Sequence, residues 1–423
     1  MVEKQTNWAG NFTYNAARWH RPETIEQLQE LVRGCRKLRA VGSRHSFNGI
    51  ADSSEDLISL DQMDPGLALD RERMTVTVSG GVRHGHLGQE LNRAGYALHN
   101  MASLPHISVA GACATATHGS GDGNGNLATA VAAFEFVTAS GERVTLSREQ
   151  HGEAFYGAVV GLGGVGVVTK LTLDISPAFE MRQDVYENLP LAQVEEHFDE
   201  ITASAYSVSL FTDWRRANFN QVWLKRRVAD GEAFELKPEL FGARLAARKL
   251  HPIGELSAEN CTEQLGARGP WHERLPHFRL AFTPSSGEEL QTEYLVPRQH
   301  ALAALRAIER VSQSITPLLM ISEVRTIAAD NLWMSPCYRQ ACVAIHFTWK
   351  QDWPAVRNLL PLIEAELAPL QARPHWGKLF TMPAARVQAL YEKLPEFQQL
   401  LRDYDPQGKF RNAFLDSYIF AGV

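Results

Sequence analysis

The chain has 423 residues, of which 44% are hydrophobic and 21% charged, as in ordinary globular proteins with more than one domain. Its formal net charge of −6 gives no reason to expect nucleic acid or an anionic membrane surface as a partner. Its five cysteines are odd in number and form no C-x-x-C pair, so neither a disulfide framework nor a zinc site is indicated.

The first predicted elements are a helix and a short strand that leads into a small polar loop. Thr24 and Gln27 fit a capping box, and the apolar positions that follow predict a helix. A strand over 37–41 then leads into the sequence GSRHS at 42–46. Successive backbone N–H groups in such a turn can form a nest for an anion, usually phosphate. Taken alone, this loop is more simply a surface turn with a chance histidine, His45.

A second glycine-rich segment makes a ligand-binding role for that loop the better interpretation. After a predicted strand over 75–78 and a helix over 86–94, residues 100–126 read NMASLPHISVAGACATATHGSGDGNGN. This segment is too polar for a core helix and too rich in glycine for a stable strand. Apolar residues are interleaved with its glycines, unlike in a linker. We therefore expect its backbone to lie flat against a large planar ligand, with N–H and hydroxyl groups reaching a pyrophosphate.

The next predicted elements are a hairpin and a helix, which lead into a misleading motif. Strands over 131–138 and 143–146 flank a turn, and a helix follows over 153–160. Residues 161–166 then read GLGGVG, which matches G-x-G-x-x-G. A dinucleotide fingerprint needs a strand before it and a helix after it, whereas here the order is reversed. We therefore predict a turn from a helix into a strand over 167–173.

Polar side chains of two later strands are predicted to face one surface. The segments ISEVRT and VAIHFTW read as strands, in which residues i and i+2 point the same way. Glu323 and Arg325 therefore share a face, and His346 and Thr348 share a face of the neighbouring strand. For Glu323 and Arg325 alone, a surface ion pair is a reasonable alternative. The same pattern on both strands favours a binding site.

Pro177 marks the first expected domain boundary. The region that follows alternates long strands with helices, among them a helix expected over 297–314, which is typical of an antiparallel sheet backed by helices. Near its end the chain is expected to return to the first domain. The predicted division is 1–177 for the first domain, 178–372 for an inserted domain and 373–423 for the return.

Motifs distributed from about residue 7 to about residue 415 resemble one family of flavoproteins. The two glycine-rich loops are similar to those of the vanillyl-alcohol-oxidase-type flavoproteins, which hold FAD between two small subdomains. The resemblance implies an α+β fold, with a PCMH-type FAD-binding domain and an inserted cap domain of antiparallel sheet and helices that binds the substrate. Seven stretches indicate the alditol oxidase (xylitol oxidase) branch, namely NWAGN at 7–11, GSRHSFN at 42–48, NMASLPHISVAG at 100–111, AYSVSLFTDW at 205–214, NCTEQ at 260–264, GPWHERLPHFR at 269–279 and RPHWGK at 373–378.

The resemblance also implies roles for individual residues. His45 matches the residue that carries a covalent 8α-histidyl bond to FAD, and Lys378 and Arg325 match the catalytic residues beside the reacting hydroxyl. Ala102 is small, which would leave oxygen a path to the flavin, and we state this as a hypothesis. The other substrate-binding residues would be Ser103, Glu323, His346 and Thr348. The other FAD-binding residues would be Gly42, Ser43, Arg44, Ser46, Ser103, Ser108, Gly111, Thr115, His118, Gly119, Val168 and His375.

The implied reaction is oxidation of the C1 hydroxyl of an acyclic polyol, such as xylitol or sorbitol, to the aldose. Flavin N5 would take the hydride, and O2 would re-oxidise the flavin, giving hydrogen peroxide. An aldonolactone oxidase or dehydrogenase is the nearest alternative, because the HWGK and Glu-x-Arg motifs are similar there. A non-catalytic flavin or polyol-binding protein is a further alternative. A serine hydrolase is another, although no G-x-S-x-G surrounds Ser46 or Ser120.

No metal, nucleic acid or membrane partner is expected. The N-terminus has no apolar leader, and no uncharged apolar run approaches the roughly 20 residues of a membrane span. We therefore expect a cytoplasmic monomer whose partners are the polyol and O2.

Overall fold

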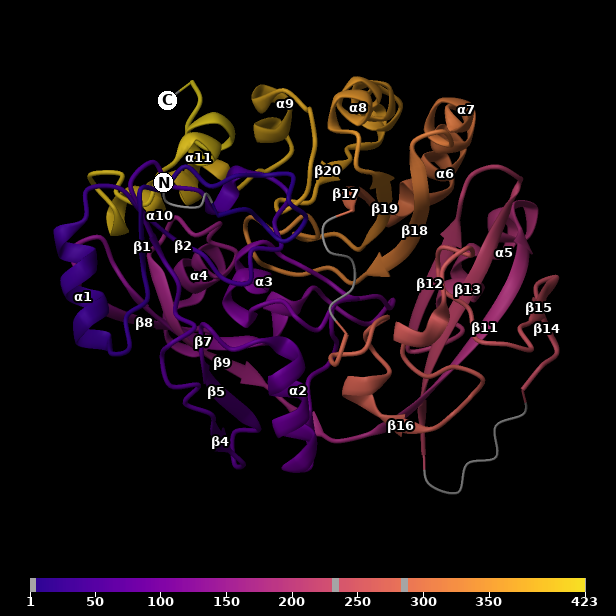
Figure 1. Ribbon diagram of the computed structural model, residues 1–423, viewed down its shortest axis with the longest axis horizontal. Coiled ribbons are helices and arrows are strands. Elements are labelled where there is room, and N and C mark those ends of the chain that lie inside the picture. The colour runs from indigo at the N-terminus through magenta and orange to yellow at the C-terminus, as the bar shows by residue number, and fades with distance from the viewer. Residues whose placement is uncertain (1–4, 230–235, 283–287, 423) are drawn as a thin grey trace.

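The computed structural model describes residues 5–229, 236–282 and 288–422. In Figure 1 the N-terminal part lies at the left, the later strands in the middle and at the right, and the C-terminal helices above the N-terminal part. No helix in the described ranges is both long and apolar enough to cross a membrane. The combination of small sheets, one large antiparallel sheet and covering helices confirms the expected α+β class.

The N-terminal part contains a small parallel sheet and a larger antiparallel one. The parallel sheet has the strand order β1-β3-β2, and the antiparallel sheet has the order β4-β5-β9-β7-β8. The strands of the two sheets are β1 (Arg18–His20), β2 (Leu38–Ala40), β3 (Asp56–Ile58), β4 (Ala68–Asp70), β5 (Thr75–Ser79), β7 (Val131–Val137), β8 (Arg143–Ser147) and β9 (Val167–Asp174). A short antiparallel pair joins β6 (Tyr96–Ala97) and β10 (Ser176–Pro177). The helices of this part are α1 (Ile25–Gly34), α2 (His84–Arg93), α3 (Val109–Ala114) and α4 (Arg148–Val159).

Helix α1 begins where the sequence predicts, because Thr24 caps it. The Thr24 side chain accepts a hydrogen bond from the backbone N–H of Gln27, and the Gln27 side chain accepts one from the backbone N–H of Glu23. Two N–H groups that no helical carbonyl can reach are thereby satisfied. The buried side chains of Leu28 and Val32 pack into a core shared with β2, β3 and β7. This packing fixes the strand from which the loop at 42–46 emerges.

The later chain forms a ten-stranded sheet whose neighbouring strands are all antiparallel. Its order is β14-β15-β11-β13-β12-β18-β19-β17-β20, and β16 pairs with β11. The strands are β11 (Glu180–Pro190), β12 (Ser207–Thr212), β13 (Asn218–Val228), β14 (Glu239–Leu240), β15 (Ala243–Leu245), β16 (Gly269–Pro270), β17 (Glu289–Pro297), β18 (Leu319–Ile327), β19 (Cys342–Lys350) and β20 (Arg373–Pro374).

Helices cover one face of this sheet and leave the other to form a site. Val324, Ile345 and Phe347 point to the covered face and share a buried core with Leu305 and Leu360 of two of these helices. Residues at the alternate positions of the same strands therefore point to the opposite face. The covering helices are α5 (Leu191–Thr202), α6 (Ala301–Arg310), α7 (Ser312–Ile315) and α8 (Trp353–Leu367).

The C-terminal segment packs against the N-terminal part, and both termini lie on the same side of Figure 1. Its helices are α9 (Ala384–Ala389), α10 (Leu394–Tyr404) and α11 (Ala413–Tyr418). The Asn412 side chain donates hydrogen bonds to the carbonyls of Gly49, Ile50 and Asp52. The carbonyl of Lys409 accepts a hydrogen bond from the first residue of β2. The domain boundaries at 177 and 372 stay predictions.

Two local predictions have different outcomes. The turn predicted over 161–166 is confirmed, because α4 ends at Val159 and β9 begins at Val167. The single helix expected over 297–314 is wrong. A 3-10 turn precedes α6, and Val311, with φ −103° and ψ 9°, separates α6 from α7.

Candidate active site

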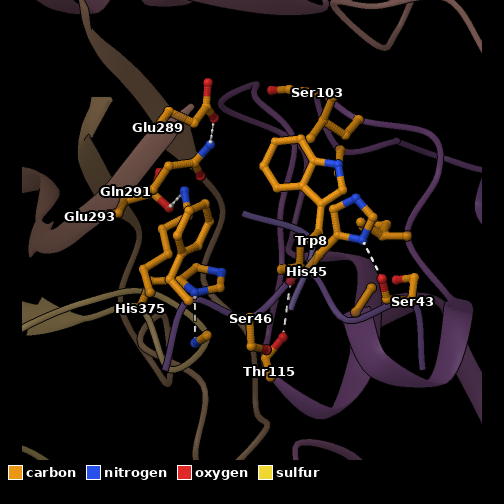
Figure 2. Close-up of a pocket in the computed structure, with 18 of the residues that line it drawn as sticks. Trp8, Ser43, His45, Ser46, Ser103, Thr115, Glu289, Gln291, Glu293 and His375 are labelled. Atoms are coloured by element: carbon orange, nitrogen blue, oxygen red, sulfur yellow. Dashed lines mark hydrogen bonds and ion pairs between the residues drawn. The ribbon is translucent and has the colours of Figure 1, made fainter. Parts of the chain in front are cut away.

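A cavity of about 600 Å³ lies between the loops of the N-terminal part and the uncovered face of the large sheet. Figure 2 shows Trp8, His45 and Ser103 on one side of it and Gln291 and Glu293 on the other. Its walls therefore come from segments that are far apart in the sequence. All the predicted substrate-binding residues line it, namely Ser103, Glu323, Arg325, His346, Thr348 and Lys378.

The loop at 42–46 lines the cavity, and its backbone N–H groups have no protein acceptor in the described ranges. Arg44 has φ 60°, the left-handed conformation that bends such a loop into an anion nest. Its guanidinium donates to Gln5 Oε1, so Arg44 offers its backbone to the cavity. Gly42 cannot carry a side chain without displacement, since a Cβ there would lie 2.1 Å from Ser108 Oγ. The loop can therefore hold a phosphate group.

His45 lies at the end of this nest as a neutral imidazole. Its ring stacks on Trp8, with centroids 5.1 Å apart and planes 17° from parallel (Figure 2). Its Nδ1 lies 3.0 Å from the carbonyl oxygen of Ser43. Burial lowers the pKa of His45 to about 4, so the ring carries a lone pair at neutral pH. A neutral imidazole with a fixed orientation is the nucleophilic form of histidine.

The glycine-rich segment supplies the adjoining wall, although two predicted residues lie elsewhere. The N–H of Ser108 donates to Ser43 Oγ at 3.0 Å, which joins this segment to the first loop. Gly119 is absent from the cavity wall and packs against the carbonyl of Met101. Val168 lines a separate, much smaller cavity. The predicted residues that do line the main cavity are Ala102, Ser103, Ser108, Gly111, Thr115, His118 and His375.

The polar faces predicted for two strands meet on one surface. Strands β18 and β19 are antiparallel neighbours, and their register places Glu323 directly opposite His346. Glu323, Arg325, His346 and Thr348 are all buried, which excludes the alternative of a surface ion pair. Burial would raise the pKa of Glu323, but the charge of Arg325 and the hydrogen bond from His277 outweigh it and lower the pKa. The carboxylate is therefore ionised and can accept hydrogen bonds.

Glu293 is a charged residue of this site that was not predicted from the sequence. It lies on β17, is 1% exposed, and accepts from Arg325 Nη2 at 2.7 Å and from Lys378 Nζ at 2.8 Å. Burial would raise its pKa, but the charges of Lys378 and Arg325, together with the neighbouring His118 ring, outweigh it and hold the pKa of Glu293 well below its usual range. The sequence does contain a pattern that could have indicated Glu293, because Gln291 and Glu293 alternate with less polar residues along β17 and therefore share a strand face.

Lys378 links Glu293 to a second hydrogen-bonded pair. Its Nζ lies 2.8 Å from His346 Nδ1, and His346 Nε2 lies 3.0 Å from Thr348 Oγ1. When Lys378 donates to Nδ1, the imidazole proton is on Nε2 and is donated to Thr348, whose hydroxyl proton remains available to a ligand. Burial lowers the pKa of Lys378, Glu293 opposes this change, and Arg325 adds to it.

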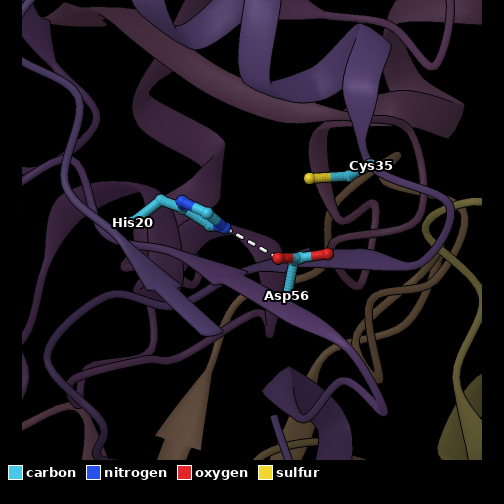
Figure 3. A group of neighbouring side chains, drawn as sticks. All are labelled: His20, Cys35 and Asp56. Carbon is cyan, nitrogen blue, oxygen red and sulfur yellow. Dashed lines mark hydrogen bonds and ion pairs between the residues drawn. The ribbon is translucent and has the colours of Figure 1, made fainter. Parts of the chain in front are cut away.

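Side chains of metal-ligand type also meet at the small parallel sheet, away from the cavity. Figure 3 shows His20 Nε2 directed at Asp56, at 2.7 Å, with Cys35 nearby. Arg18 donates to both oxygens of Asp56, at 2.6 and 2.7 Å. Burial raises the pKa of Cys35 to about 11, which keeps it a thiol. Asp56 is already paired with Arg18 and His20, and Cys35 keeps its proton, whereas a metal ligand would be a thiolate. The group is therefore better explained as a structural ion pair than as a metal site.

Comparison with known proteins gives matches along the whole chain. A family model described as FAD binding domain matches residues 16–147, and one described as D-arabinono-1,4-lactone oxidase matches residues 286–418. The alditol oxidase of a Streptomyces species is 50% identical over 418 residues, which are 98% of this chain and 99% of that protein. The L-gulono-1,4-lactone dehydrogenase of Mycobacterium tuberculosis is 27% identical over 443 residues, 97% of each protein.

Solved structures of cholesterol oxidases have the same fold. The enzyme from B. sterolicum superimposes with a TM-score of 0.78 at 14% identity, over 98% of this chain and 96% of that one. A solvent-stable cholesterol oxidase superimposes with a TM-score of 0.79 at 15% identity, over 98% and 97% of the two chains. These likenesses support the expected architecture of a flavin domain with a large antiparallel sheet.

Proposed function

The chain belongs to the alditol oxidase family of FAD-dependent enzymes, and we propose that it oxidises the C1 hydroxyl of acyclic polyols such as xylitol and sorbitol to the aldose. One observation carries this proposal, a cavity wall with hydrogen-bonding side chains at several successive positions. Such a wall suits a chain of hydroxyls and should reject monohydric alcohols, because these would leave buried polar groups unpaired. The side chains are those of Glu323, Arg325, His346, Thr348 and Lys378.

FAD fits the facing wall of the same cavity. The five backbone N–H groups at 42–46 have no protein acceptor in the described ranges and suit the pyrophosphate. When bound, FAD supplies the acceptor for the C1 hydride and returns the electrons to O2, which gives hydrogen peroxide. Ser46 and Thr115 extend this wall with further polar groups, and His375 approaches it from the large sheet.

We extend the proposal to a covalent bond between His45 and the 8α carbon of the flavin. This bond would replace one C–H bond of the 8α methyl group and the imidazole N–H bond, and the two electrons and two protons released would pass to O2, giving hydrogen peroxide. The neutral, stacked imidazole of His45 at the end of the nest supports this. Holoenzyme precipitated with acid should keep its visible flavin absorbance in the pellet. His45→Ala protein should release that absorbance into the supernatant. Release from both proteins would restrict the proposal to non-covalent FAD.

Arg325 and Lys378 are the proposed partners of the reacting hydroxyl. Glu293 accepts hydrogen bonds from both side chains, so their N–H groups are oriented before substrate binds. As the C1 hydroxyl loses its proton, these donors stabilise the alkoxide that develops. Donors that are already oriented stabilise this charge more than water does, because they need not reorganise during the reaction. Glu323 can accept hydrogen bonds from two further hydroxyls, which orients the polyol.

Lys378 is also the proposed acceptor of the hydroxyl proton, which requires its neutral amine. Burial favours that form by lowering the pKa of Lys378. After the transfer, the ammonium can donate to Glu293, to His346 and to the substrate oxygen. We expect Lys378→Ala to keep its flavin and to lose turnover by about 10²–10⁴-fold, the usual range for a lost acid–base group. Normal turnover in this variant would refute the role.

The overall proposal is tested by mixing the yellow holoenzyme with xylitol without air and then admitting air. Loss of the visible flavin band, followed by its recovery with formation of peroxide, is the expected result. Loss without recovery would instead identify a dehydrogenase that uses another acceptor.

An aldonolactone oxidase or dehydrogenase is a second candidate. The match of residues 286–418 to the D-arabinono-1,4-lactone oxidase model favours it. The same experiment distinguishes the two, because this candidate predicts bleaching by an aldonolactone and none by xylitol or sorbitol.

A further inference from the structure

A second lysine is buried behind the polar wall, and the proposed reaction does not use it. Lys225 lies on β13 and has no exposed surface. Its Nζ lies 2.5 Å from the carbonyl oxygen of Leu275, 2.8 Å from that of Pro276 and 3.0 Å from His277 Nδ1. Three acceptors match the three N–H groups of an ammonium. Burial nevertheless lowers the pKa of Lys225 to about 7, so keeping it charged costs stability.

His277 connects this lysine to the proposed substrate site. Its Nε2 lies 2.8 Å from Glu323 Oε1. The ring is held edge-on by Phe211 and Trp223, with centroid distances of 5.5 and 5.2 Å. Its backbone N–H donates to the carbonyl of Ser103. The imidazole therefore has a fixed position between a cation and a carboxylate that lines the cavity.

The direction of these hydrogen bonds follows from chemistry. An ammonium can only donate, so His277 Nδ1 must accept from Lys225, and the ring proton must be on Nε2. That N–H then donates to Glu323 Oε1. Without Lys225, the ring could carry its proton on Nδ1 and present a lone pair to the carboxylate. Lys225 thus reinforces the tautomer that Glu323, which can only accept, also requires, and this tautomer holds Glu323 in place.

We propose that Lys225 and His277 are positioning residues that orient Glu323 toward the polyol hydroxyls that do not react. This inference rests on the proposed polyol oxidation. Without such a role, a lysine at this buried position would lower stability, because an apolar side chain could fill the same space without the free-energy cost of burying a charge. The conspicuous stretch GPWHERLPHFR, which contains His277, then acquires a function.

The test compares substrates that do and do not use Glu323. In Lys225→Met, the KM for xylitol should rise roughly tenfold, the value of about one hydrogen bond to a charged group, while kcat changes little. The KM for 1,2-propanediol, which lacks the distal hydroxyls, should change far less. Addition of Lys225→Met to Glu323→Gln should have little further effect, because the group being oriented is already altered. Equal losses on both substrates, or additive effects, would overturn the proposal.

Two controls separate positioning from general damage. Lys409 is also a buried lysine that donates to backbone carbonyls, those of Val32 and Ala139, and it lies away from the cavity. Lys409→Met should lower stability without this substrate-dependent change in KM. His277→Leu should reproduce the effect of Lys225→Met. His277→Gln should restore part of the lost affinity, since an amide can both accept and donate.

A last readout needs no turnover. In holoenzyme labelled with ¹⁵N-histidine, His277 should show the Nε2–H tautomer, and Lys225→Met should change that signal. An unchanged signal would refute the role of Lys225 even in an active enzyme. If xylitol and sorbitol fail to bleach the parent protein, the proposed function fails, and the tautomer still tests the positioning separately.

Discussion

At the scale of single residues, Glu293 controls the protonation of Lys378 in the site. It pairs with Arg325 and Lys378 while almost completely buried, so it raises the pKa of Lys378 against the effect of burial. In Glu293→Gln the pKa of Lys378 should fall further. If Lys378 accepts the substrate proton, the acidic limb of the pH profile of kcat/KM should move to lower pH, by about one unit or more.

A matched control for this variant is Glu364→Gln. Glu364 is a buried carboxylate on α8 that accepts hydrogen bonds from Tyr294 and Thr381, behind the sheet. Its loss should lower stability and leave the pH profile in place. Movement of the alkaline limb instead of the acidic one, in Glu293→Gln, would show that Lys378 acts as an ammonium.

Glu323 could be predicted as a site residue from the sequence, whereas the place of Glu293 in the site could not. Glu323 and Arg325 alternate within an otherwise apolar strand, and β19 repeats the pattern, so a shared polar face was predictable. Glu293 follows the same rule on β17, but β17 becomes the neighbour of β19 only through the sheet order. Its partners Arg325 and Lys378 are 32 and 85 residues away. No local pattern identifies that pairing.

At the scale of elements, the glycine-rich segment works by close packing of backbone as well as by contact with ligand. A Cβ on Gly119 would lie 2.4 Å from the carbonyl oxygen of Met101 and 2.5 Å from Asn100 Oδ1. The Met101 oxygen belongs to the backbone, so it cannot rotate away as the end of a flexible side chain could. Gly119→Ala should therefore lower the free energy of unfolding by about 1–3 kcal/mol, the usual cost of overpacking. Urea unfolding of the holoenzyme measures this.

Gly123→Ala is the comparison within the same segment. A Cβ there would meet no atom within 4 Å, and the residue has no left-handed φ. Its unfolding midpoint should equal that of the parent. An equal loss of stability in both variants would show that the contact at Gly119 is not the cause of the loss.

At the scale of the whole molecule, the cavity exists only because two parts of the chain close on it. The loops at 42–46 and 100–126 could be assigned to a ligand from composition, and the strand faces could be assigned from period-two patterning. The distance between these walls depends on how the large sheet docks on the N-terminal part. Periodicity contains no information on such docking, so only the resemblance to a family brought His45 and Lys378 into one site.

Several buried histidines make the whole fold sensitive to acid. Burial lowers the pKa of His84 and of His277 to about 4 and that of His375 to about 3, against about 6.5 in an unfolded chain. Between these values the unfolded chain binds more protons than the native protein, so stability falls as pH falls. Each such histidine contributes a slope of about 1.4 kcal/mol per pH unit, from pH 6.5 down to its folded pKa. Urea unfolding of the holoenzyme between pH 7 and pH 4 should show this decline.

His84 offers the clearest test, because neither ring nitrogen has a hydrogen-bond partner in the described ranges. His84→Leu should make the decline shallower, whereas His86→Gln, at an exposed position of the same helix, should not. A slope unchanged by His84→Leu would mean that this histidine does not contribute to the acid sensitivity.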